Sequence, residues 1–309
     1  MLPFEIPPTF CAFAGRGEDW TAWLAALPRL VRDIVDEWEL TFDGPPMHGY
    51  CALVVPVRTT GGGPAVVKFA WPHDEEEHEH LGLQALAGDG TVRLYRADPQ
   101  RHVMLLERLH ADEDLTSVAD VEAAQIVAAF YRRIHIPALP QLRTLTSYIS
   151  RWDADLERLP TDAPVPRRLV EQAISLGRSF VSDGASDGTM IHGDLHYQNV
   201  LAADREPWLV IDPKPMSGDP HYEVAPLLWN RWDEVVGSGN VRDAVRRRFH
   251  AVVDTAELDE HRARDWVVVR EMHNAMSAIQ DADAAQGGLT AEGREWITRA
   301  VTIAKAVQD

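Results

Sequence analysis

Four side chains with the functional groups of a metal-dependent active site lie in one short stretch: His192, Asp194, Asn199 and Asp212. The amide of Asn199 and the carboxylate of Asp212 offer oxygen atoms, which Mg²⁺ prefers as ligands while phosphates and water fill its other positions. The carboxylate of Asp194 remains as a group that can accept a proton. The stretch therefore predicts a Mg²⁺ site with a carboxylate base beside it.

A β-hairpin is the element expected to position these groups. The residue pattern predicts a short strand over 199–203, a turn over 204–207 and a second strand over 208–211. Because hairpin strands run in opposite directions, Asn199 at the start of the first and Asp212 just after the second should lie at the same end. The polar loop before the hairpin leads to that end too.

The spacing of these residues resembles a kinase catalytic loop. His192-x-Asp194-x-x-x-x-Asn199 matches the kinase pattern H-R-D-x-x-x-x-N, with Gly193 where protein kinases carry arginine. Asp212 stands where the kinase DFG aspartate stands, although its surroundings read Ile-Asp-Pro-Lys. The resemblance implies that Asp194 orients and deprotonates an acceptor hydroxyl while His192 supports the loop. It also implies that Asn199 and Asp212 hold Mg²⁺.

The surrounding sequence is similar to the aminoglycoside phosphotransferase family, which shares the motif HGDLHxxN found at 192–199. The segments IDPKP at 211–215 and GDPHYE at 218–223 are most similar to its streptomycin 6-phosphotransferase and hydroxyurea-kinase branch. This implies an ATP- and Mg²⁺-dependent O-phosphotransferase that moves the γ-phosphate to a hydroxyl of an aminoglycoside such as streptomycin. It also implies an α+β, bilobal, protein-kinase-like fold. A small N-lobe of antiparallel sheet and helices is expected over 1–108, and a larger, mainly helical C-lobe over 109–309.

Nucleotide-binding residues are expected in the N-lobe. In the resemblance, Lys68, near the end of an apolar predicted strand, corresponds to the lysine that contacts the α and β phosphates. Glu79 fits best as the glutamate that orients this lysine, and Glu75 and Glu76 are close alternatives. Gly49 ends the loop over 44–49 that is expected to cover the phosphates, where a missing side chain permits close backbone approach. An ordinary hairpin turn is the alternative for that loop.

The segment Met-Leu-Leu-Glu-Arg-Leu at 104–109 resembles the hinge between the lobes. There, backbone groups around Glu107 and Leu109 are expected to pair with adenine. A plain edge strand is the alternative.

Acidic and aromatic side chains of the C-lobe are the candidates for binding the acceptor. An aminoglycoside carries several cations and hydroxyls, so carboxylates and flat walls are expected around it. The acidic candidates are Glu223, Asp233, Glu234, Glu271, Asp281 and Asp283, and the aromatic ones are Trp229 and Trp232. A solvated helix face is the alternative for each acid.

The charge balance agrees with a cationic small-molecule partner. The formal net charge of −18 argues against nucleic acid as a partner, and an acidic cleft attracts cations. The alternative is that this charge serves solubility alone. Two cysteines, Cys11 and Cys51, cannot form a disulfide framework, and no apolar run approaches the length of a membrane span. We therefore expect a cytoplasmic protein without a membrane partner, as a monomer or weak dimer.

Hydrophobic periodicity and breaker residues predict the remaining elements. Strands are expected over 39–42, 50–57, 65–69, 88–95 and 102–106, and helices over 17–37, 73–87, 118–135, 146–159, 166–183, 240–255, 259–283 and 290–307. Pro28 is expected to break the first helix. Asp219 and Pro220 are expected to begin another that continues through Trp229.

Three other functions compete with this interpretation. Residues 193–196, Gly-Asp-Leu-His, also resemble the GD-x-H core of dinuclear metallophosphatases, but the sequence has neither the early D-x-H before this core nor the later G-N-H that those enzymes need. An inactive nucleotide-binding kinase is disfavoured because all the catalytic residue types are present. A kinase for another hydroxylated metabolite is the main alternative, because ATP-binding machinery does not specify the acceptor.

Overall fold

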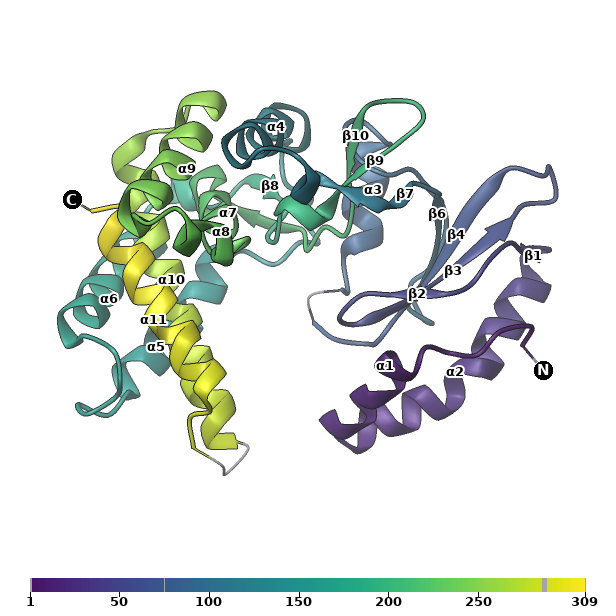
Figure 1. Ribbon diagram of the computed structural model, residues 1–309, viewed down its shortest axis with the longest axis horizontal. Helices are drawn as coiled ribbons and strands as arrows, with labels where there is room; N and C mark the ends of the chain where they lie inside the picture. The colour runs from purple at the N-terminus through teal and green to yellow at the C-terminus, as the bar shows by residue number, and fades with distance from the viewer. Residues whose placement is uncertain (1, 75, 285–287, 309) are drawn as a thin grey trace. The chain divides into compact units, whose positions relative to one another are not determined.

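The structure, a computed structural model, describes residues 2–74, 76–284 and 288–308 (Figure 1). The chain divides into two compact units: Met1–His110 with Ala203–Leu209, and Ala111–Ala202 with Val210–Asp309. The first boundary, after His110, lies close to the position 108 expected from the sequence. The inclusion of 203–209 in the first unit has no counterpart in the sequence-based division.

The first unit is built on an antiparallel sheet with strand order β1-β3-β4-β6-β5, and β2 pairs with β3. The strands are β1 (Thr41–Phe42), β2 (Met47–His48), β3 (Ala52–Arg58), β4 (Pro64–Ala70), β5 (Leu94–Asp98) and β6 (Val103–Glu107). The register places Lys68 of β4 opposite Val54 of β3 and Met104 of β6. This lysine therefore lies within the sheet and not on a frayed strand end.

Helix α2 (Glu18–Glu37) shares a hydrophobic core with this sheet, in which its Leu27 and Ile34 join Leu53 of β3. The helix is continuous through Pro28, which corrects the prediction of a break. Burying each large apolar side chain contributes about 1.5–3 kcal/mol, and several such side chains outweigh the roughly 3 kcal/mol cost of an internal proline. The unit's other helices are α1 (Pro8–Cys11), a 3₁₀ helix (Ala12–Arg16) and α3 (Glu79–Leu86).

The second unit is mainly helical. Its helices are α4 (Asp120–Ile134), α5 (Leu145–Arg158), α6 (Arg167–Ser182), α7 (Ala225–Trp229), α8 (Trp232–Gly237), α9 (Val241–Ala256), α10 (Glu260–Ala284) and α11 (Ala291–Ala306). Apolar residues of α10 pack against α6, where the rings of Trp266 and Phe180 stack with centroids 3.8 Å apart. In the parts of the chain that the structure describes, no helix is long and apolar enough to cross a bilayer.

Short strands and 3₁₀ helices form the frame of the predicted catalytic stretch. Strand β8 (Thr189–Ile191) pairs antiparallel with β11 (Met216–Gly218), and β10 (Trp208–Val210), β9 (Val200–Ala202) and β7 (His110–Asp114) form a sheet in that order. The 3₁₀ helices are Leu115–Ser117, Gly184–Ser186, Tyr197–Asn199 and Pro220–Val224. The predicted hairpin is present as β9 and β10, and the backbone N–H of Ile211 donates to the carbonyl of Asn199 at 2.9 Å.

Polar and glycine-rich segments account for the main differences from the predicted elements. Strand β7, His-Ala-Asp-Glu-Asp, is mostly exposed and shows no hydrophobic alternation, so its sequence gives no strand signal. The strand predicted over 88–95 begins only at Leu94, because Gly88 and Gly90 turn the backbone with φ of +82° and +69°. The helix start at Asp219 is confirmed, since its carboxylate accepts from the N–H of His221 at 3.0 Å.

Candidate active site

His192 is buried and ties the loop after β8 to the end of the hairpin. Its ring Nδ1 accepts from the backbone N–H of Asp194 at 3.2 Å, and its Nε2 lies 2.9 Å from the carbonyl oxygen of Ile211. Because Nδ1 acts as an acceptor, Nε2 carries the proton and donates to Ile211. Burial lowers the pKa of His192. The neutral ring therefore supports the loop, and its single ring N–H is already used in the hydrogen bond to Ile211.

Gly193 explains why this loop lacks the arginine found in protein kinases. Its φ is +83°, and a Cβ placed on it would lie 2.6 Å from the carbonyl oxygen of Lys214. The close approach is fixed from the other side as well, because the N–H of Lys214 donates to the carbonyl of His192 at 2.7 Å. A side chain at this position is excluded by both backbone conformation and space.

Glu223 holds the backbone of the same loop. Its Oε2 accepts from the N–H of His192 at 3.0 Å and its Oε1 from the N–H of Gly193 at 2.6 Å. Burial favours a raised pKa for Glu223, but the hydrogen bond and charge of His135, and the N–H of Gly193, outweigh it and lower that pKa. The residue has no exposed area. This corrects its assignment to the acceptor site, because a fully buried carboxylate with both oxygens engaged does not face a soluble ligand.

Arg270 of α10 supports the loop from another side, and the sequence analysis did not identify it. The guanidinium donates to the carbonyl oxygen of Gly193 at 2.5 Å and to that of Tyr222 at 3.0 Å. It also lies 5.0 Å from the ring centre of Trp229. A single arginine inside the apolar run Trp-Val-Val-Val-Arg-Glu-Met is the sequence signal that marks it, because a buried arginine needs specific partners.

Asn199 and Asp212 present oxygen atoms suited to a hard cation. The side-chain NH₂ of Asn199 donates to the carbonyl oxygen of Asp194 at 2.8 Å. The amide oxygen of Asn199 does not take part in this bond and is the atom that could bind a metal ion. Asp212 has a φ of +57°, an uncommon value for a non-glycine residue. Its carboxylate forms an ion pair with Lys214, whose Nζ lies 3.0 Å from Oδ1 of Asp212. The donor set fits Mg²⁺.

Asp194 is the exposed carboxylate of the loop. Its side chain is 40% exposed, and the nearest ring nitrogen of His196 is 3.8 Å away. Its backbone N–H and carbonyl are both bonded, to His192 and Asn199 respectively. An accessible carboxylate on an immobilised backbone is the arrangement that a positioned base requires.

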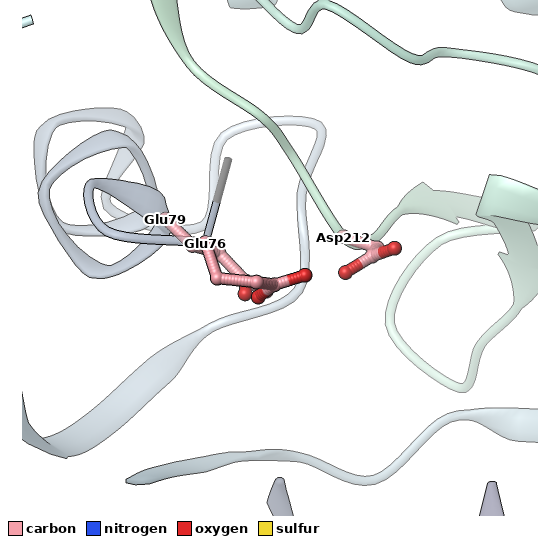
Figure 2. A group of neighbouring side chains, drawn as sticks. All are labelled: Glu76, Glu79 and Asp212. Atoms are coloured by element: carbon pink, nitrogen blue, oxygen red, sulfur yellow. The ribbon is translucent and has the colours of Figure 1, made fainter. Parts of the chain in front are cut away.

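In the first unit, Lys68 is buried and contacts two carboxylates, those of Glu76 and Glu79, which Figure 2 draws without the lysine. Its ammonium lies 3.0 Å from Glu76 and 2.5 Å from Glu79. The glutamate preferred from the sequence therefore contacts the lysine, together with the alternative Glu76. Glu75, the other alternative, lies outside the described residues. Two acidic partners hold the ammonium group of the lysine in place. Figure 2 also draws Asp212, which belongs to the second unit.

The glycine loop differs in detail from the prediction. Strand β2 occupies the second half of 44–49, so the turn is formed by residues 49–51 between β2 and β3. The N–H of Gly49 donates across the turn to the carbonyl of Ala52 at 2.9 Å. No atom lies within 4 Å of a Cβ placed on Gly49. Space within the first unit therefore does not require glycine there. Tyr50 at the tip is 77% exposed.

The predicted hinge residues lie at the end of β6. The N–H of Glu107 donates to the carbonyl of Arg93 at 2.9 Å, while its carboxylate accepts from Arg205 at 2.9 and 3.1 Å. The backbone N–H of Glu107 is therefore occupied within the unit, which argues against the expected pairing of this N–H with adenine. Leu109 follows, half-buried, between β6 and β7.

A pocket of about 440 Å³ in the second unit contains several of the predicted acceptor residues. Its walls include Trp229, Trp232, Asp233 and Glu234, and the sequence analysis missed Trp296 and Arg299. The guanidinium of Arg299 lies 5.3 Å from the ring centre of Trp232 and 5.0 Å from that of Trp296. Because Arg270 contacts both Trp229 and the carbonyl of Gly193, one buried side chain joins this pocket to the catalytic loop.

Two further acidic candidates, Glu271 and Asp281, are not among the residues that line this pocket. Glu271 is 1% exposed, and burial raises its pKa to about 8. This corrects its assignment as an acceptor residue, since it is protonated at neutral pH and supplies no negative charge. Asp281 is exposed on α10 outside the pocket lining. The side chain of Asp283 lies outside the described part of the chain.

Comparison with known proteins places these features in a family. Residues 37–283 match the family model described as "Aminoglycoside/hydroxyurea antibiotic resistance kinase". The chain is 42% identical to a streptomycin 6-kinase of Streptomyces glaucescens, over 91% of this chain and 93% of the relative. It is 39% identical to the streptomycin 6-kinase of Streptomyces griseus, over 94% and 93% of the two chains. A hydroxyurea phosphotransferase of Kitasatospora aureofaciens is 34% identical over 91% of this chain and 80% of its own.

Solved structures agree on the fold at lower sequence identity. The aminoglycoside phosphotransferase APH(4)-Ia, in a ternary complex with ADP and hygromycin B, matches with a TM-score of 0.57 and 14% identity, over 90% of this chain and 98% of its own. The amicoumacin kinase hAmiN, in complex with AMP-PNP, Ca²⁺ and Ami, matches with a TM-score of 0.59 and 12% identity, over 90% and 93%. These likenesses confirm the predicted α+β, kinase-like fold.

Proposed function

Because the chain belongs to the aminoglycoside/hydroxyurea antibiotic resistance kinase family, we propose that it transfers the γ-phosphate of ATP to a hydroxyl group of streptomycin. Asp194 carries the chemical part of this proposal. It is an exposed carboxylate on a loop whose backbone is held by His192, Glu223 and Arg270. Phosphoryl transfer depends on positioning and on charge neutralisation more than on covalent catalysis, and this loop supplies positioning.

Asp194 acts on the acceptor. Its carboxylate accepts a hydrogen bond from the reacting hydroxyl, aims the oxygen at the γ-phosphorus, and takes the proton as the new P–O bond forms and the bond to the ADP oxygen breaks. His192 does not compete for this proton, because its unprotonated nitrogen, Nδ1, already accepts a hydrogen bond from the backbone N–H of Asp194. The rigid loop keeps the hydroxyl in line with the leaving group, which is the main requirement of the reaction.

Charge neutralisation at the phosphates is the role proposed for Lys68, Asn199 and Asp212. Lys68 contributes a positive charge that Glu76 and Glu79 keep in one orientation. Asn199 and Asp212 are the residues that hold Mg²⁺, which when bound neutralises charge on the phosphate oxygens. The ammonium group of Lys214 already contacts the carboxylate of Asp212. The surrounding fold therefore accommodates a positive charge at this carboxylate.

The tryptophan-lined pocket beside α8 binds the acceptor. Streptomycin carries guanidinium groups, which stack on indole rings and pair with carboxylates through two parallel hydrogen bonds. Trp229 and Trp232 supply the rings, and Asp233 supplies an exposed carboxylate. The carboxylate of Glu234 is bound to Arg231, so Asp233 is the main acidic contact.

The proposal is tested with purified protein by measuring ADP release from ATP with streptomycin, hydroxyurea or a neutral sugar as acceptor. Streptomycin should stimulate release, and mass spectrometry should show one added phosphoryl group on the antibiotic. Asp194→Asn should remove both signals. The 34% identity to a hydroxyurea phosphotransferase makes hydroxyurea the second candidate acceptor. Stimulation by hydroxyurea or a sugar, without stimulation by streptomycin, would contradict the proposed acceptor.

A further inference from the structure

The turn between β2 and β3 is contacted by a segment that precedes the family's shared region. The segment comprises α1 and the following 3₁₀ helix, residues 8–16. The family model matches only from residue 37 onward. Residues 8–16 therefore precede the residues that the family model matches, yet they contact the turn that follows the 44–49 loop expected to cover the phosphates.

Arg16 makes the most direct contact. Its Nη1 donates to the carbonyl oxygen of Tyr50, at the tip of the turn, at 3.0 Å. The guanidinium also lies between two rings, 4.0 Å from the ring centre of Tyr50 and 3.8 Å from that of Phe13. The ring centres of Phe13 and Tyr50 are themselves 5.9 Å apart. A planar cation between two aromatic faces fixes both rings, so the tip residue is held by its backbone and its side chain.

Thr9 contacts His48, the last residue of β2 and the residue that leads into the turn. Nδ1 of His48 lies 3.0 Å from the carbonyl oxygen of Gly49, an acceptor only, so Nδ1 carries the proton. Nε2 of His48 is then an acceptor, and the hydroxyl of Thr9 donates to it at 2.7 Å. Phe10 adds a ring contact, with its centroid 5.2 Å from that of the imidazole.

The far end of the turn is held through α2. The N–H of Trp71 donates to the carbonyl oxygen of Cys51 at 2.7 Å. The indole of Trp71 stacks on that of Trp20 in α2, with centroids 4.7 Å apart and planes at 10°. Trp20 is buried in the unit's core. His48 and Tyr50 thus contact the N-terminal segment directly, and Cys51 is linked to α2 through Trp71. Gly49 is hydrogen-bonded to His48 and Ala52.

We propose that residues 8–16 are a positioning element for nucleotide binding, in which Arg16 and Thr9 hold the 48–51 turn in the conformation that receives the phosphates of ATP. This inference rests on the proposed phosphotransferase function. A glycine-containing turn with an exposed tip samples many backbone conformations when unsupported, and each must be given up on binding. Contacts that restrict the turn beforehand lower that entropic cost and strengthen binding. The element therefore contributes to nucleotide affinity without touching the acceptor.

The test compares Arg16→Ala with Arg29→Ala, a control that removes an exposed arginine of the adjoining helix α2, paired with Asp33. Amide hydrogen exchange over 48–52 should accelerate in Arg16→Ala, with exchange in β4 and β6 unchanged. The KM for ATP and the Kd of ADP should rise roughly three- to tenfold, as expected for an exposed cation–π site with one hydrogen bond. The KM for streptomycin should stay constant. Thr9→Val should show the same pattern more weakly, and Arg16→Lys should recover part of the affinity.

Two results would overturn the inference. One is native exchange over 48–52 together with a native Kd for ADP in both Arg16→Ala and Thr9→Val. The other is faster exchange throughout the sheet with equal increases in both KM values, which would make the segment a general support of the unit. Exchange and ADP binding need no acceptor. A failure to phosphorylate streptomycin would therefore count against the proposed acceptor alone and leave these two measurements decisive.

Discussion

Glu223 accepts the backbone N–H of Gly193 at 2.6 Å and so fixes the residue immediately before the proposed base Asp194. The second carboxylate oxygen accepts the N–H of His192 at 3.0 Å. The two N–H donors thus use both oxygens of Glu223, which a carboxylate provides and a side-chain amide does not. The orientation of Asp194 thus depends on a buried charge that never meets the substrate.

Glu223→Gln should therefore lower kcat without a comparable change in the KM for ATP. A glutamine accepts from one of the two N–H groups and turns its own NH₂ toward the other, leaving a buried donor without a partner. We expect a loss of about 1–3 kcal/mol in unfolding free energy and at least a tenfold loss in kcat, measured by urea denaturation and steady-state kinetics. Glu257→Gln, which alters an exposed carboxylate paired with Arg132, is the control and should match the native protein.

Asp194→Asn tests the base directly. The variant keeps the size of the side chain but removes its ability to take a proton, so turnover should fall by roughly 10²-fold or more. The Kd of ADP, measured by calorimetry, should be unchanged because Asp194 acts on the acceptor. A variant with native turnover would remove Asp194 from the mechanism.

The two glutamates beside Lys68 should differ in importance. Glu79 lies 2.5 Å from the ammonium and Glu76 lies 3.0 Å from it. Glu79→Gln should raise the KM for ATP more than Glu76→Gln does, because the shorter charged contact contributes more to the lysine's orientation. Steady-state kinetics on both variants measures the difference. Equal effects, or a larger effect at Glu76, would reverse the assignment.

Asp233 should matter for the acceptor only. Asp233→Asn removes the exposed carboxylate of the tryptophan-lined pocket and should raise the KM for streptomycin several-fold, with the KM for ATP unchanged. Added salt should reduce the difference between native and variant, because it screens exposed charges over about 8–10 Å. Asp281→Asn removes an exposed acid from α10 outside this pocket and serves as the matched control.

Glu271 makes stability depend on pH in an unusual direction. Burial raises its pKa in the folded protein from 4.5 to about 8, so between these pH values the unfolded chain is ionised while the folded chain keeps the proton. The unfolded state is then favoured increasingly as pH rises, and the cost becomes constant above about pH 8. Glu271→Gln should gain stability over the native protein across this range, on the order of a few kcal/mol at its upper end. Denaturation of both proteins at several pH values measures this gain, and a difference that does not change with pH would contradict the raised pKa.

The catalytic loop could be predicted because its signal is local: the spacing of His192, Asp194 and Asn199 is readable from adjacent residues. Glu223 and Glu271 were assigned to the acceptor site because their burial depends on how α10 packs, which no local pattern records. Arg270 was missed for the same reason, since its partners Gly193 and Tyr222 are distant in the chain. Secondary structure follows this division. Long amphipathic helices such as α2 were found, whereas the exposed strand β7 has no apolar periodicity to reveal it.

The division of the chain also has a consequence for any attempt to isolate its parts. Residues 203–209 count with the first unit, so the polypeptide passes from one unit to the other after His110, after Ala202 and after Leu209. Arg205 from this returning segment bonds the carboxylate of Glu107 at 2.9 Å and also the carbonyl of Thr91. A fragment that ends at His110 would lack Arg205. The carboxylate of Glu107, at the end of β6, would then lose its cationic partner. The first unit is therefore interrupted in sequence, and a truncation after His110 does not contain all of it.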